Sequence, residues 1–336
     1  MLFLFLAGMI ACDAALGQKA ERETVSIYEH GGKDVKIFIS EIPVPTDIEG
    51  RLKTPMAFYT LKFKYNDNFF SFNLPQGSFN ELSAGQKEKL IQGLLGLYDR
   101  SFELFSGIFG YVPAGFHFNV TFGEVKKQTA SNYVYQRSKT SNIYPGFLPF
   151  ASGEAALNPE QRFIFFHEIG HSLVGIAIGS IVNPKAKFIE EGFADYFAEQ
   201  ASGMDIKELH GQDIFYISRQ QSENIKGLTQ LDTEISIWGE KYVMTAPRPK
   251  GYVGLTHHAF GLQFIKAFVG VFGAGDLPLF LKRFRQAQDA LTNGDQGTAM
   301  VRKIFRKMGY AQEKVSEFEG RLHRNLAENV FKVKSK

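Results

Sequence analysis

The chain has 336 residues, of which 44% are apolar and 22% are charged, and its formal net charge at pH 7 is +3. This composition predicts a globular protein with one two-lobed domain or two domains, and excludes a repeat or low-complexity chain. The basic residues are scattered and no nucleic-acid motif occurs, so the sequence predicts no nucleic-acid partner. Most of the 33 phenylalanines are expected in the core.

The chain begins with an unbroken apolar run, Leu2–Ala11. This run is too short to span a bilayer, but it is typical of the central region of a signal peptide. Small residues further along form an acceptable cleavage site, which makes residues 1–17 the predicted signal peptide. Alternatively, Met9–Cys12 is similar to a bacterial lipobox, which would make residues 1–11 the leader. We therefore expect an exported bacterial protein, periplasmic or secreted, that contacts a membrane only if Cys12 carries a lipid anchor.

The segment after the leader, residues 18–78, is predicted to be β-rich. Short runs of alternating apolar residues are separated there by Gly, Asn and Pro turn signals. We interpret the segment as an accessory subdomain or as an N-terminal extension of a catalytic sheet. A helix over 80–107 and strands over 117–122 and 133–137 are predicted to follow.

The clearest helix prediction begins at Pro159 and ends before Gly179. Asn158 is a good N-cap, Pro159 suits the first helical position, and Gln161 lies where a capping box places its Glu or Gln. A buried stripe at helical spacing supports the assignment. Its members are Phe163, Phe166, Gly170, Leu173, Val174 and Ala177.

This predicted helix carries the motif His167-Glu168-Ile169-Gly170-His171. The two histidines are four residues apart, so they lie one turn apart on one face and can reach one ion. A histidine pair at this spacing, with a glutamate after the first histidine, is typical of a catalytic zinc site in which the glutamate is the general base. The sequence therefore predicts one Zn²⁺ bound by His167 and His171, with Glu168 beside the open coordination position.

A catalytic zinc has three protein ligands, and we predict that Glu191 is the third. Glu191 opens a second segment with helical apolar spacing, twenty positions after His171. Asp195 lies one turn later and faces the same way. Because a metal-bound histidine usually donates its other ring N–H to a carboxylate, Asp195 is expected to accept that hydrogen bond from His167. Glu190 remains an alternative third ligand.

The rest of the chain is predicted to form a polar linker or insertion over 203–250 and a helical lobe over 251–336. The linker is less regular and ends in a Pro-rich stretch. Apolar periodicity predicts four helices in the lobe. They cover 260–272, 277–290, 297–308 and 312–330.

The two motifs together, HEIGH and EEGFADYFA, resemble the gluzincin metallopeptidases, the group that includes thermolysin and the aminopeptidase-N-like enzymes. In the latter the third ligand directly precedes Gly-Phe-Ala, as Glu191 does here, and the thermolysin-like pattern has an Asp at the position of Asp195. Nineteen residues separate His171 from Glu191, one more than is most common in the group, which keeps Glu190 open. The resemblance implies an α+β fold with a zincin-like catalytic lobe over 79–202, whose active-site helix lies under a small mixed sheet.

The resemblance also implies hydrolysis of peptide bonds in a peptide or protein substrate, with zinc-bound water activated by Glu168. Related enzymes stabilise the oxyanion with a downstream Tyr or His. His258 is the first candidate because it precedes Gly261 by three residues, as a Tyr precedes a Gly in the aminopeptidase-N-like enzymes. His257 and Tyr252 are the other candidates. Two alternative functions are a catalytically silent zinc-binding envelope protein and a zinc amidase that acts on cell-wall peptides.

Overall fold

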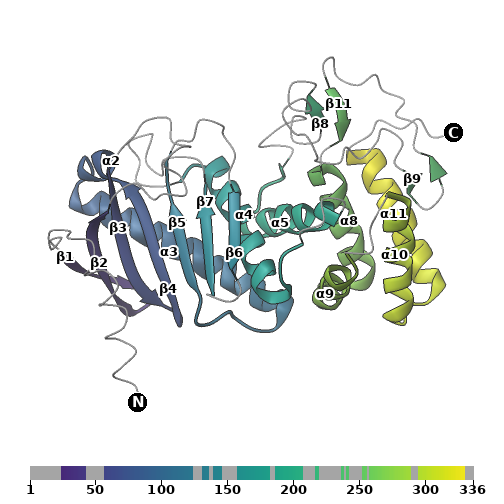
Figure 1. The fold of residues 1–336 in the computed structure, drawn as a ribbon, viewed down its shortest axis with the longest axis horizontal. Helices are drawn as coiled ribbons and strands as arrows, with labels where there is room; N and C mark the ends of the chain where they lie inside the picture. The colour runs from purple at the N-terminus through teal and green to yellow at the C-terminus, as the bar shows by residue number, and fades with distance from the viewer. Residues whose placement is uncertain are drawn as a thin grey trace.

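A computed structural model gives the fold of this chain (Figure 1). It describes residues 24–42, 57–123, 131–135, 139–145, 157–181, 186–206, 216–218, 236–237, 240–241, 252–255, 257–288 and 294–329. The predicted leader 1–17, including Cys12, and most of the predicted linker 203–250 lie outside these residues. Export, processing and the lipid anchor therefore stay predictions.

A mixed sheet of seven strands forms one end of the described fold, in the order β1-β2-β3-β4-β5-β7-β6 (Figure 1). The strands are β1 (Thr24–His30), β2 (Lys33–Ile42), β3 (Phe58–Tyr65), β4 (Asn68–Pro75), β5 (His117–Thr121), β6 (Ser131–Tyr135) and β7 (Thr140–Tyr144). The pairs β4–β5 and β5–β7 are parallel and the other pairs are antiparallel. The predicted β-rich segment and the strands before the helix that carries His167 and His171 thus belong to one continuous sheet, and the predicted α+β class is confirmed.

The long helix α3 (Ala84–Phe109) follows the short helix α2 (Gln76–Asn80) and packs on the sheet. It begins later than the predicted residue 80 because Ser83 and Gln86 form a capping box. Tyr98 on α3 is fully buried, and the centroid of its ring lies 4.7 Å from that of Phe70 and 5.4 Å from that of Phe118. Aromatic packing of this kind accounts for many of the phenylalanines predicted in the core.

The C-terminal lobe is helical, as predicted, and lies at the opposite end from β1 (Figure 1). Its elements are α8 (His257–Phe272), the 3₁₀ turn η3 (Ala274–Asp276), α9 (Leu277–Ala287), α10 (Gly294–Lys307) and α11 (Gln312–Asn329). Two further two-stranded antiparallel sheets are separate from the seven-stranded sheet. One pairs β8 (Tyr216–Ser218) with β11 (Tyr252–Leu255), and the other pairs β9 (Ser236–Ile237) with β10 (Glu240–Lys241). Helices α4 (Pro159–Ile178) and α5 (Lys187–Ser202) lie between the sheet and this lobe (Figure 1).

Among the described helices, none is by itself long and apolar enough to cross a membrane. The segments Phe260–Phe272 and Ala274–Ala287 pass the length and composition test only as a pair, and the chain bends by 113° between them.

His117 on β5 gives a prediction for the pH dependence of stability. Its Nε2 lies 2.7 Å from Ser71 Oγ, and burial, helped by the charge of Lys62, lowers the pKa of His117 below its ordinary value of 6.5. The unfolded chain therefore binds a proton near pH 6.5 that the folded chain binds only at lower pH, so the free energy of unfolding should fall as the pH decreases through this window. Urea unfolding at several pH values should show a smaller decrease in the free energy of unfolding, as the pH is lowered, for His117→Gln than for the native chain. Equal falls would contradict this assignment.

Candidate metal centre

Helix α4 positions the histidine pair. It begins at Pro159 and ends at Ile178, and Asn158 and Gln161 form the predicted capping box. The helix contacts β6, β7, α3, α5 and α9, so most of its residues are buried. These neighbours fix the direction in which its histidines point.

Helix α5 supplies the carboxylates, and it begins at Lys187 rather than at Glu191, where the sequence analysis placed its start. The correction has a packing reason: Ile189, Phe193 and Phe197 are spaced four residues apart and are fully buried along one face. A Cβ on Gly170 of α4 would lie 3.2 Å from the Cα of Ala194, which shows how closely the two helices pack. Glu191 therefore projects from the second turn of a helix that is held against α4.

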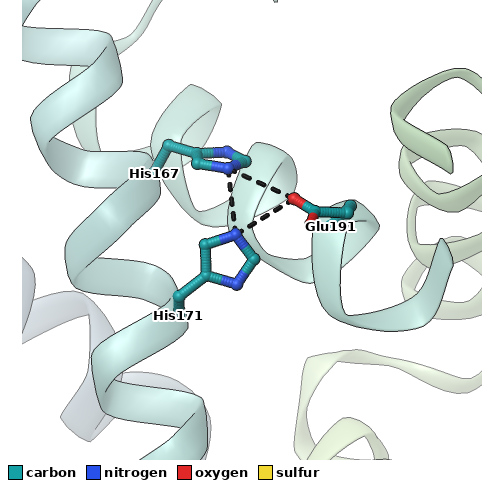
Figure 2. Close-up of side chains that lie close together, drawn as sticks. All are labelled: His167, His171 and Glu191. Atoms are coloured by element: carbon teal, nitrogen blue, oxygen red, sulfur yellow. Dashed lines mark hydrogen bonds and ion pairs between the residues drawn. The ribbon is translucent and has the colours of Figure 1, made fainter. Parts of the chain in front are cut away.

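Three predicted ligand atoms converge between these helices (Figure 2). His171 Nε2 lies 3.0 Å from His167 Nε2 and 3.0 Å from Glu191 Oε2, and His167 Nε2 lies 3.4 Å from the same oxygen. Ligands placed about 2.0–2.2 Å from a tetrahedral zinc are roughly 3.3–3.6 Å apart, so only a small adjustment is needed to admit an ion. These three side chains could hold a metal ion.

The outer ring nitrogens of both histidines face carboxylates. His167 Nδ1 lies 2.8 Å from Asp195 Oδ1, so the predicted pair is in contact, but this oxygen has no hydrogen bond of normal geometry. His171 Nδ1 lies 3.5 Å from Glu190 Oε1, a pairing that the sequence analysis missed. The adjacent glutamates thus lie at different nitrogens. Glu191 contacts the inner nitrogens, which are the Nε2 atoms of His167 and His171, and Glu190 contacts an outer nitrogen, Nδ1 of His171. The Glu190-Glu191 pair was the only sequence signal, and it did not show which side each would face.

Helix α8 brings His258 to the same place. Its Nδ1 lies 2.8 Å from Asp195 Oδ2, and its Nε2 lies 3.9 Å from Glu191 Oε2. The His258 side chain keeps 29% of its surface exposed, so it borders the centre from the solvent side. The side chains of the other two oxyanion candidates, His257 and Tyr252, lie outside the described part of the structure.

Two glycines allow α8 to approach α5 this closely. A Cβ on Gly261 would lie 1.8 Å from the carbonyl oxygen of Phe188, and a Cβ on Gly192 would lie 2.1 Å from the carbonyl carbon of Gly261. Real Cβ atoms essentially never approach other atoms this closely, so the two backbones are in direct contact. Because Gly192 directly follows Glu191, and Gly261 is one turn from His258, this contact sets the distance between the two side chains.

The electrostatics of the centre follow from burial opposed by close charge pairs. Burial alone would lower the pKa of His167, but the Asp195 carboxylate raises it to about 9. Burial alone would raise the pKa of Asp195, but the charges of His258 and His167 lower it to about 2. Burial raises the pKa of Glu168, and the neighbouring imidazoles partly oppose that rise. Asp195 is therefore an ionised acceptor that faces the Nδ1 atoms of two imidazoles, and a metal ion at His167 Nε2 would replace the proton on that nitrogen.

The sequence matches no protein-family model, and no curated protein is significantly similar to it. These comparisons therefore do not test the resemblance to the gluzincins, and its support comes from the residues of the candidate metal centre and their arrangement.

Proposed function

We propose that this protein is a single-zinc peptide hydrolase of the gluzincin type. The observation that carries the proposal is the convergence of His167 Nε2, His171 Nε2 and Glu191 Oε2 from two packed helices, with Glu168 next to the first histidine. Two imidazoles and one carboxylate are a donor set that zinc favours, and three protein ligands leave a position for water or substrate. The outer-nitrogen partners Asp195 and Glu190 are also typical of metal-binding histidines.

A zinc ion at these atoms would polarise the scissile carbonyl and lower the pKa of water toward neutrality. Glu168 is 4% exposed and close enough to both histidines for their charges to act on its pKa. Its carboxylate would accept the proton of the attacking water and deliver it to the leaving amine. His258 Nε2 borders the same space and would donate a hydrogen bond to the oxygen that becomes negative as the carbonyl is attacked.

The sheet offers a place for the substrate backbone. Strand β6 is an edge strand of the described sheet, and α4 contacts both β6 and β7. An extended peptide that adds to the free edge of β6 would run past the histidine-bearing helix. This arrangement supports the zincin-like architecture that the sequence resemblance implies.

Cleavage of a diverse peptide library, read by mass spectrometry, tests the proposed activity. Residues 18–336 loaded with zinc should cut peptides, phenanthroline should abolish the cuts, and added zinc should restore them. The cut sites would also distinguish endopeptidase from exopeptidase action. A protein that holds one zinc and cuts no peptide would contradict the proposal and favour a silent zinc-binding protein or an amidase for cell-wall peptides.

The ligand assignment gives a separate prediction for zinc affinity. Glu191→Ala removes an inner ligand and should weaken zinc binding by well over about 100-fold, whereas Glu190→Ala removes an outer partner of His171 and should cost about 10–100-fold at most. Competition with a chelator of known affinity measures both. Equal losses would contradict the assignment of Glu191 as the third ligand.

A further inference from the structure

Asp195 contacts two imidazoles that belong to different helices. Its Oδ1 lies 2.8 Å from Nδ1 of His167 on α4, and its Oδ2 lies 2.8 Å from Nδ1 of His258 on α8. The carboxylate is fully buried on α5, between these helices. Oδ2 forms a hydrogen bond with His258, while Oδ1 lies at ion-pair distance from His167 Nδ1 without a hydrogen bond of normal geometry.

The two imidazoles have the same relation to the metal centre. An ionised carboxylate only accepts hydrogen bonds, so each Nδ1 is a donor and each ring is turned with Nε2 away from Asp195. For His167 that nitrogen is one of the three ligand atoms, and for His258 it lies 3.9 Å from Glu191 Oε2. His258 is not part of the group formed by His167, His171 and Glu191. It belongs to a second group, with His167 and Asp195, whose ligand atoms also lie within 4.8 Å of one another. Its Nε2 therefore borders the first group of ligand atoms.

We propose that Asp195 is a shared positioning residue, whose single carboxylate orients both a metal-ligand imidazole and the substrate-facing imidazole of His258. The catalytic part of the inference rests on the proposed hydrolase function, whereas the orientation of the two rings does not. The backbone contact between Gly192 and Gly261 holds α8 at the distance that this sharing requires. Metal binding and oxyanion stabilisation would thus depend on one side chain.

Asp195→Asn tests the sharing because the amide keeps an oxygen at only one of the two positions. At the other position its NH2 group is a donor and would face an imidazole N–H donor. In proton NMR of the zinc-loaded protein, the buried Nδ1–H groups of His167 and His258 should give two slowly exchanging downfield resonances. His258→Ala should leave one, and Asp195→Asn should leave one at most. Asp205→Asn, at an exposed carboxylate just beyond the same helix, is the matched control and should leave both. The proposal is overturned if Asp195→Asn retains both resonances.

Zinc affinity and kinetics give the second readout. Asp195→Asn should weaken zinc binding about 10–100-fold, whereas His258→Ala should change it by less than about threefold. At saturating zinc, both variants should lower kcat more than they raise KM, and the double variant should lose less than the product of the two single losses. Multiplicative losses, or a loss of zinc affinity in His258→Ala as large as in Asp195→Asn, would overturn the shared role. If the native protein cuts no peptide, the hydrolase proposal fails, while the resonances and affinities still decide whether Asp195 is shared.

Discussion

Glu168→Gln is expected to retain zinc and to lose peptide hydrolysis by about 100-fold to 10,000-fold in kcat/KM. Glutamine has nearly the same shape as glutamate but cannot accept a proton from water. Glu168 is not one of the three converging ligands, and its side chain is 4% exposed in the wall of the centre. The substitution therefore removes the proton acceptor and preserves the donor set.

Kinetics on a peptide found by the library screen, together with zinc content after dialysis, would measure this effect. Glu160→Gln is a matched control, because Glu160 lies exposed in the first turn of the same helix. This control should keep its activity, with a loss in stability of at most about 1 kcal/mol from the changed charge at the helix N-terminus. Normal cleavage by Glu168→Gln would show that the mechanism is wrong, and loss of zinc together with activity would show that Glu168 has a different place in the site.

Gly261→Ala is expected to lower the free energy of unfolding by about 3 kcal/mol or more. The added methyl would lie 1.8 Å from the carbonyl oxygen of Phe188 and 2.8 Å from the Cα of Gly192. These are backbone atoms within packed helices, so no side-chain rotation relieves the overlap, and α8 must move away from α5. The movement should also separate His258 from Asp195 and reduce any hydrolytic activity of the folded fraction.

Urea unfolding of Gly261→Ala beside Gly93→Ala provides the comparison. Gly93 is an exposed glycine within helix α3, and a Cβ there would meet nothing within 4 Å. Gly93→Ala should therefore raise stability by up to about 1 kcal/mol, because alanine has the higher helix propensity. Similar stability in the two variants would contradict the direct backbone contact between α5 and α8.

The features that the sequence predicted correctly depend on neighbours within a few residues. The capping box of α4 involves Asn158 and Gln161, and the facing of His167 and His171 follows from the helical repeat. The four C-terminal helices were likewise found from apolar periodicity, with boundaries that differ by a few residues. The start of α5 was placed too late because the sequence does not show that Phe188 and Ile189 are buried. Their burial extends the apolar face of the helix toward its N-terminus.

The sequence by itself therefore determined the helix that carries the histidine pair, the chemical types of the converging side chains and the α+β class. Only the tertiary structure decided that Glu190 faces the outer nitrogen of His171, and that Asp195 uses its second oxygen on His258. The physical reason is one of range: the repeat of a helix fixes which side chains share a face. The distance between side chains on different helices depends on packing, here on the contact of Gly192 with Gly261, whose partners are 69 positions apart in the chain.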